Sequence, residues 1–106
     1  MVKEISVFDL KQLQDEKKEV VVIDVRNPDE YEYCNIGGEL IPMQEIPERF
    51  SEIPKDKTVV VQCHHGGRSA QVVNWLEQAQ GYENVFNLAG GIHAWSNEID
   101  SGIPTY

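Results

Sequence analysis

The sequence contains few cysteines and no long hydrophobic run, and each shortage excludes a class of protein. Two cysteines, Cys34 and Cys63, are too few for the disulfide framework of a small secreted domain. No apolar run approaches the roughly 20 residues that span a bilayer, so we expect no membrane segment and no membrane partner. The segment "MVKEISVFDLKQLQDEKK" also lacks the apolar core of a signal peptide, which makes the cytoplasm the expected compartment. In that reducing compartment we expect a reactive thiol rather than a disulfide.

Basic residues are also scarce. Nine lysines and arginines stand against 18 aspartates and glutamates, which gives a formal net charge of −9 at pH 7. A negative overall field repels phosphate backbones, so we expect no nucleic-acid partner. An anion site in such a chain requires a local concavity of positive charge. The length of 106 residues, with 41% hydrophobic and 25% charged residues, predicts one globular domain over residues 1–106.

Short β-branched runs alternate along the chain with segments of helical period. This alternation predicts an α/β fold in which helices cover a parallel sheet. Residues 20–25 (VVVIDV) and 58–63 (TVVVQC) are strongly apolar, as expected for central strands buried on both faces. Further short strands are predicted at residues 5–7, 39–43 and 84–88, and helices at residues 9–18, 28–33, 44–53, 68–80 and 90–99.

Several residues mark where the predicted helices begin and end. Asp9 is the expected N-cap of the first helix. Asn27 is placed to cap the second helix and Pro28 to open it, since proline fits the first helical position. Gly81 is expected to end the helix that starts near Arg68, because glycine readily adopts the left-handed conformation found at that position.

The segment "CHHGGRS", from Cys63 to Ser69, follows the second apolar strand directly. In open parallel α/β sheets ligands bind at the carboxyl ends of the strands, so this cysteine lies where chemistry is expected. Gly66 and Gly67 allow positive φ angles that turn several N–H groups inward, and the helix that follows adds its positive end. Such a cup stabilises an anion, and therefore favours the thiolate form of Cys63. Arg68 supplies a permanent positive charge for an oxyanion.

The other side chains of the loop extend this hypothesis, and alternatives remain. Ser69 can cap the helix or donate to the sulfur, and His64 and His65 can add protonatable donors. One alternative is that Cys63 is a buried, inert apolar residue. Another is a metal site formed by Cys63, His64 and His65; adjacent residues seldom point at one ion and no spaced CxxC partner exists, so we expect no metal. A third is a phosphatase, which the loop length disfavours: four residues separate Cys63 from Arg68, one fewer than in cysteine-dependent phosphatases.

Three motifs in order make the chain resemble the single-domain rhodaneses, a family of sulfurtransferases. They are "DVRNPDEY" from Asp24 to Tyr31, the loop from Cys63 to Ser69, and the ending that includes "LAGGIHAW" from Leu88 to Trp95 and then Gly102 and Pro104. The resemblance implies a doubly wound α/β fold with five mostly parallel strands and helices on both faces of the sheet. It also implies that the loop cysteine alternates between a thiolate and a persulfide, with no organic cofactor and no metal.

The resemblance also assigns supporting roles around the loop. Asp24 and Arg26 resemble the family pair that organises the end of the strand, and Arg26 is placed to pair with Glu30. The family's usual glycine–histidine pair is absent, and Cys34 stands at the start of the segment that replaces it. Cys34 is either an inert thiol or a residue that resolves the persulfide by forming a disulfide with Cys63.

These observations predict a cytoplasmic sulfurtransferase with Cys63 as its nucleophile. Its donor would be thiosulfate or a persulfide, and its acceptor would be cyanide in the test tube and a thiol or a thioredoxin-like protein in the cell. The alternative is a non-catalytic binding or redox-sensing module, which would not need to keep the loop intact. His93, in the last predicted helix, is expected to be a surface or core-edge residue. The substrate-binding residues expected around the sulfur are His64, His65, Gly66, Gly67, Arg68 and Ser69.

Overall fold

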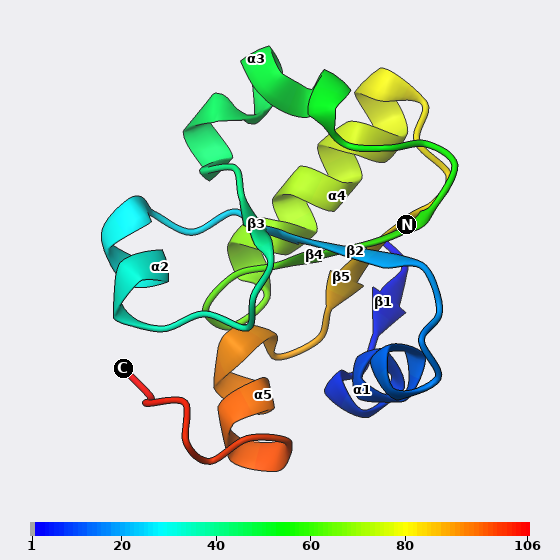
Figure 1. Ribbon diagram of the computed structural model, residues 1–106. Coiled ribbons are helices and arrows are strands. Elements are labelled where there is room, and N and C mark those ends of the chain that lie inside the picture. Colours follow the sequence, from blue (N-terminus) through cyan, green and yellow to red (C-terminus); the bar gives the residue numbers. More distant parts are fainter. Residues whose placement is uncertain (1) are drawn as a thin grey trace.

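The computed structural model describes residues 2–106, which form a five-stranded sheet with helices on both faces (Figure 1). The order of the strands across the sheet is β1-β5-β4-β2-β3, and every neighbouring pair is parallel. The predicted α/β fold with a five-stranded sheet is therefore confirmed. The strands are β1 (Glu4–Ile5), β2 (Val20–Asp24), β3 (Glu39–Leu40), β4 (Thr58–Gln62) and β5 (Val85–Leu88).

Two layers of helices cover the sheet. α1 and α5 lie on one face, and α3 and α4 lie on the other (Figure 1). Within residues 2–106, no helix combines the length and the apolar character needed to cross a bilayer. The helices are α1 (Val7–Asp15), α2 (Pro28–Tyr33), α3 (Ile46–Arg49), α4 (Gly67–Gln80) and α5 (Gly91–Glu98), and 3₁₀ turns at Met43–Glu45 and Phe50–Glu52 flank α3.

The central strand β4 joins the two apolar layers because its side chains alternate between the faces of the sheet. Val59 and Val61 pack in one layer with apolar residues of α4. Val60 packs in the other layer with Leu10 of α1 and Trp95 of α5. All three valines are 0% exposed, which confirms that β4 is buried on both faces. β2 meets the same expectation only at its end, since its first three residues are half-buried.

Of the three predicted helix caps, those at Asn27 and Gly81 are confirmed and the one at Asp9 is wrong, and the first helix also ends at Asp15 rather than at residue 18. Asn27 is the N-cap of α2 and Pro28 opens that helix, while Gly81 ends α4 with a φ of 71°. α1 starts earlier than predicted because Ser6, and not Asp9, is its N-cap. The Asp9 N–H donates to Ser6 Oγ at 3.0 Å. Serine and aspartate are comparable N-caps, so residue preference alone does not choose between them.

The segment predicted as one helix at residues 44–53 is divided into a 3₁₀ turn, α3 and a second 3₁₀ turn. Pro47 accounts for the break between the first 3₁₀ turn and α3, because proline has no N–H to bond the carbonyl of the preceding turn. The strand predicted at residues 39–43 likewise stops at Leu40, two residues before Pro42.

The loop after β4 is attached to the start of α5 by two backbone hydrogen bonds. The N–H of Ile92 donates to the Cys63 carbonyl at 2.9 Å, and the N–H of His93 donates to the His64 carbonyl at 3.0 Å. Gly91 permits this approach, because it has a φ of 59° and a Cβ there would lie 2.4 Å from the Cys63 carbonyl oxygen. The loop and the helix can therefore meet only if this position is glycine.

We expect Gly91→Ala to destabilise the fold by at least about 3 kcal/mol, because the added methyl group combines a steric clash with the strain of a positive φ angle. Gly37→Ala is a matched control: Gly37 has a φ of 85° but nothing within 4 Å of an added Cβ. The control should lose only about 1–2 kcal/mol from backbone strain. Chemical denaturation of both variants measures the difference in unfolding free energy. Equal losses in the two variants would show that the clash of the Gly91→Ala methyl group with the loop carbonyls adds nothing to the cost of the positive φ angle.

Candidate active site

The candidate active site lies at the carboxyl end of the central strands. Cys63 comes directly after β4, and Asp24 ends the neighbouring strand β2, where it is in register with Gln62. Arg26 follows two residues later. The parallel sheet therefore brings the predicted loop and the predicted supporting pair to the same edge, where ligands of such sheets bind.

The sulfur of Cys63 is surrounded by hydrogen-bond donors from the start of α4. The N–H groups of Gly66 and Ser69 donate to Sγ at 3.1 and 3.3 Å, and the Ser69 hydroxyl lies 3.3 Å from it. Gly66 has a φ of 105°, a conformation that favours glycine. The same expectation for Gly67 is wrong: this exposed residue has no positive φ angle and is the first residue of α4, whose dipole directs its positive end toward the loop. Together these groups stabilise negative charge on a side chain that is only 1% exposed.

A chain of polar side chains continues from Ser69 behind the sulfur. The Ser69 hydroxyl also contacts Oδ1 of Asn87 in β5. Asn87 Nδ2 donates to the Glu4 carboxylate at 3.0 Å and to the Gly66 carbonyl at 3.2 Å. Because Nδ2 is the donor of the Asn87 amide, Oδ1 of Asn87 is its acceptor. The Ser69 hydroxyl has one proton, which it shares between Asn87 Oδ1 and the Cys63 sulfur. Asn87 was not among the predicted site residues, although an amide side chain within the otherwise apolar strand β5 is the feature that could have indicated it.

Arg68 forms a bidentate ion pair with Glu30. Hydrogen bonds of 2.8 and 2.9 Å join its guanidinium to the Glu30 carboxylate. The pairing raises the pKa of Arg68 and lowers the pKa of Glu30 to about 2. Glu30 was expected to pair with Arg26, and that expectation is wrong, because Arg26 reaches only the Glu30 backbone carbonyl, at 3.4 Å. An anion that binds Arg68 must therefore share it with Glu30.

Arg26 is a buried charge that joins the end of β2 to the rest of the site. Its guanidinium pairs with Asp24 at 2.7 Å, and both side chains are 0% exposed. It also donates to the Cys34 carbonyl at 2.7 Å and to the Tyr106 hydroxyl at 2.9 Å. Burial opposes the charge, but the hydrogen bonds to Asp24 and Tyr106 outweigh it, so the pKa of Arg26 is raised. Loss of either partner of such a buried pair leaves an uncompensated charge, which makes the pair a rigid part of the site.

Tyr106 joins this cluster from the other end of the chain. Its hydroxyl donates to the Glu30 carboxylate at 2.8 Å while it accepts from Arg26, and burial, followed by the contact with Glu30, raises the pKa of Tyr106 to about 12. Its ring stacks on His64 with a centroid distance of 3.7 Å and an interplanar angle of 3°. No motif in the sequence indicates this contact, which joins Arg26 to a residue 80 positions away.

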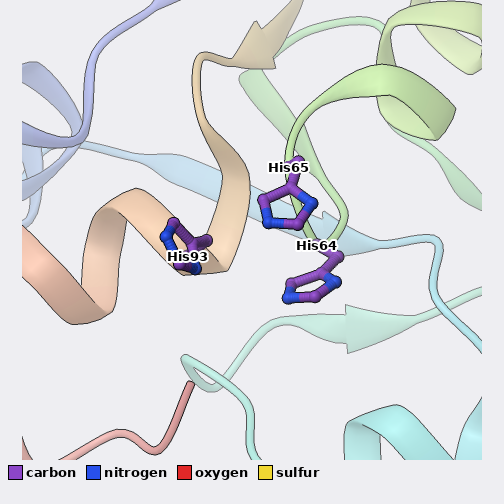
Figure 2. A group of neighbouring side chains, drawn as sticks. All are labelled: His64, His65 and His93. Atoms are coloured by element: carbon purple, nitrogen blue, oxygen red, sulfur yellow. The ribbon is translucent and has the colours of Figure 1, made fainter. Parts of the chain in front are cut away.

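The three histidines of the chain lie together beside the loop (Figure 2). His64 and His65 come from the loop and stack on each other with a centroid distance of 3.9 Å, and His93 comes from the first turn of α5. Burial, followed by repulsion from His65, lowers the pKa of His64. His93 is half-buried, in agreement with the core-edge prediction, but nothing in the sequence indicated that it meets the loop histidines.

Both cysteines are free thiols with different surroundings. Cys34 is buried, its thiol donates to the Pro104 carbonyl at 3.6 Å, and its sulfur lies 4.0 Å from the guanidinium of Arg26. Cys63 instead accepts hydrogen bonds from the start of α4. The disulfide between the two cysteines stays a prediction.

Comparisons with known proteins place the motifs of this chain in a family. Residues 6–98 match the family model described as Rhodanese-like domain. A protein named Sulfurtransferase from Allochromatium vinosum is 44% identical over 98% of this chain and 94% of its own length. Thiosulfate sulfurtransferase GlpE from Coxiella burnetii is 35% identical over 90% of this chain and 88% of its own length. Rhodanese-like/PpiC domain-containing protein 12, a chloroplastic protein of Arabidopsis thaliana, is 41% identical, but the chain spans only 38% of its length.

Solved structures agree with the sequence comparisons. A rhodanese-like domain protein from Staphylococcus aureus is similar to this chain with a TM-score of 0.82 and 33% sequence identity, over 99% of both chains. The similarity therefore covers the whole sheet and the helices on both of its faces.

We expect the Glu30–Arg68 pair to contribute about 1–3 kcal/mol of stability that acid removes. The pKa of Glu30 falls from an ordinary 4.5 in the unfolded chain to about 2 in the folded protein. Its contribution is therefore complete above pH 4.5 and is lost as the pH falls toward 2. The difference in unfolding free energy between the wild type and Glu30→Gln should shrink over that range.

The matched control for this prediction is Glu52→Gln, which removes the partner of Arg49 in a solvent-exposed ion pair. Solvent screens that pair, so its acid-dependent contribution should be smaller than that of Glu30. A difference between wild type and Glu30→Gln that stays constant from neutral to acid pH would contradict the pairing.

Proposed function

The chain belongs to the rhodanese-like domain family, and we propose that it is a sulfurtransferase that holds sulfur as a persulfide on Cys63. Relatives named as sulfurtransferases support sulfurtransferase activity in general. The observation that carries the proposal is the set of donors around the Cys63 sulfur, two N–H groups and one hydroxyl at 3.1 to 3.3 Å. A thiolate stabilised in this way is a nucleophile that needs no adjacent base.

The proposed transfer consists of two displacements at sulfur. The Cys63 thiolate attacks the outer sulfur of the donor, the S–S bond of the donor breaks, and the remainder leaves with the electron pair; with thiosulfate the leaving group is sulfite. An acceptor thiolate then attacks the outer sulfur of the persulfide and expels the Cys63 thiolate. Neither step needs an external oxidant or reductant, because each exchanges one S–S bond for another.

The dimensions of the loop favour a small sulfur donor. Four residues separate Cys63 from Arg68, and a cup of this size suits a persulfide sulfur better than a phosphoryl group. We propose thiosulfate, which the Coxiella relative's name mentions, or a persulfide as donor, and a thiol or a thioredoxin-like protein as acceptor. Free thiols suit a reducing compartment, and we propose the cytoplasm.

The other residues of the loop receive separate roles in this proposal. Arg68 binds the anionic end of the donor in competition with Glu30, and the half-buried His64 and exposed His65 form the mouth through which the donor enters. Gly66 allows the backbone to turn, Gly67 begins α4, and the Ser69 N–H donates to the sulfur. Asp24 and Arg26 support the loop from the adjacent strand without contact with the sulfur being transferred.

We expect Cys63→Ser to abolish sulfur uptake while leaving the fold intact, because the hydroxyl is a similar size but a poor nucleophile. Intact mass spectrometry after incubation with thiosulfate should show a gain of one sulfur in the wild type, and a reducing wash should remove it. Cys34→Ser is the matched control and should still gain the sulfur. Uptake that is lost in Cys34→Ser and kept in Cys63→Ser would show that Cys34, and not Cys63, is the nucleophile.

We expect Arg68→Ala to lower kcat/KM for thiosulfate by about tenfold to a hundredfold, since it removes charge-assisted hydrogen bonds to the donor. A neutral sulfane-sulfur donor should be affected much less. Arg49→Ala removes an arginine that is also paired with glutamate but lies on α3, and it controls for the loss of one positive charge. Equal losses for anionic and neutral donors in Arg68→Ala would exclude the proposed anion contact.

A further inference from the structure

The cluster of His64, His65 and His93 has a feature that the proposed sulfur chemistry does not require. One ring nitrogen from each histidine lies within 4.8 Å of the nitrogens of the other two (Figure 2). The sequence indicated no metal because His64 and His65 are adjacent, and adjacent residues seldom point at one ion. His93 removes that objection, because it approaches from a different element, α5.

Two of the ring nitrogens in this cluster are buried without a partner. Nε2 of His64 and Nδ1 of His93 are shielded from solvent and have no hydrogen-bond partner among residues 2–106. An unpaired buried polar atom costs about 1–3 kcal/mol, so such atoms in a native fold require an explanation. A metal ion supplies one, because a deprotonated imidazole nitrogen offers it a lone pair.

The spacing of the three rings is close to that of a metal site. Tetrahedral Zn²⁺ with Zn–N distances of about 2.1 Å needs nitrogens about 3.4 Å apart, compared with the upper limit of 4.8 Å observed here. His64 is held by its stack on Tyr106, whereas His65 is exposed. The His64 and His93 centroids are 6.1 Å apart, the widest of the three ring separations. These two rings must therefore approach each other, and the exposed His65 ring must leave its stack on His64, before the site closes around an ion.

The surrounding charges also permit a cation. The two arginines nearest to the loop are neutralised, Arg26 by Asp24 and Arg68 by Glu30, and the chain as a whole carries a net charge of −9. Three imidazoles suit Zn²⁺, Cu²⁺ and Ni²⁺, whereas Mg²⁺ and Ca²⁺ prefer oxygen ligands.

We infer that His64, His65 and His93 form a binding site for a divalent transition metal of the zinc type at the mouth of the Cys63 loop. The three nitrogens occupy three positions of a tetrahedron, and the fourth is open to water or to an anion. The sulfur of Cys63 is not a ligand, because it accepts its hydrogen bonds from Gly66 and Ser69.

Titration of the chelator-treated protein with Co²⁺ tests this site directly. We expect one Co²⁺ per chain with the visible absorption of tetrahedral cobalt, no thiolate-to-cobalt charge-transfer band, and displacement by Zn²⁺. His93→Asn should weaken binding by at least about tenfold, and His65→Asn should do the same at an exposed position where folding is not at risk. Circular dichroism verifies that each variant is folded.

Two control variants remove other side chains that could bind the ion. Glu98→Gln removes an exposed carboxylate of the same helix, and Cys63→Ser removes the thiol; both should keep full affinity. No binding by the wild type, binding that both histidine variants retain, or a charge-transfer band that Cys63→Ser abolishes would overturn the inference. The readout does not involve sulfur transfer, so its failure is distinct from failure of the proposed function.

Discussion

Two hydrogen bonds between the loop after β4 and the start of α5 determine the shape of the site. The first N–H groups of a helix have no partner within the helix, and here those of Ile92 and His93 bind the carbonyls of Cys63 and His64. With these carbonyls directed toward α5, the N–H groups farther along the loop are free to turn toward the sulfur. The same contact brings the His93 side chain beside the loop histidines. Both sites therefore depend on the absence of a side chain at Gly91, where a Cβ would collide with the loop.

A second constraint is that the arginines beside the loop are paired with carboxylates. Arg26 pairs with Asp24 and Arg68 with Glu30, and the Tyr106 hydroxyl connects the two pairs by contacting Arg26 and Glu30. In a chain with a net charge of −9, such paired cations attract anions only weakly at long range. The anionic donor that we propose would therefore be recognised by short-range contacts after it reaches the loop, where it competes with Glu30 for Arg68.

The elements that could be predicted from the sequence are those that depend on local pattern. The apolar runs at residues 20–25 and 58–63 predicted the central strands, because a strand buried on both faces needs apolar side chains throughout. The glycine pair and the cysteine predicted the loop for a similarly local reason. The choice of Arg68 as the partner of Glu30 could not be predicted, since two arginines were available and sequence separation contains no distances. The contacts of Tyr106 and His93 arise only when the ends of the fold come together.

The inner and outer sides of the loop differ in chemistry, and the difference decides where a cation binds. Inside, the Cys63 sulfur accepts hydrogen bonds from two N–H groups at 3.1 and 3.3 Å, and an ion that reached it would have to replace these contacts, which are each worth about 1.5–3 kcal/mol when the sulfur is charged. Outside, Nε2 of His64 and Nδ1 of His93 have no competing partner among residues 2–106. A metal ion therefore binds the histidines and leaves the thiolate available for sulfur transfer. It also places positive charge at the mouth of the loop, where Glu30 neutralises the positive charge of Arg68.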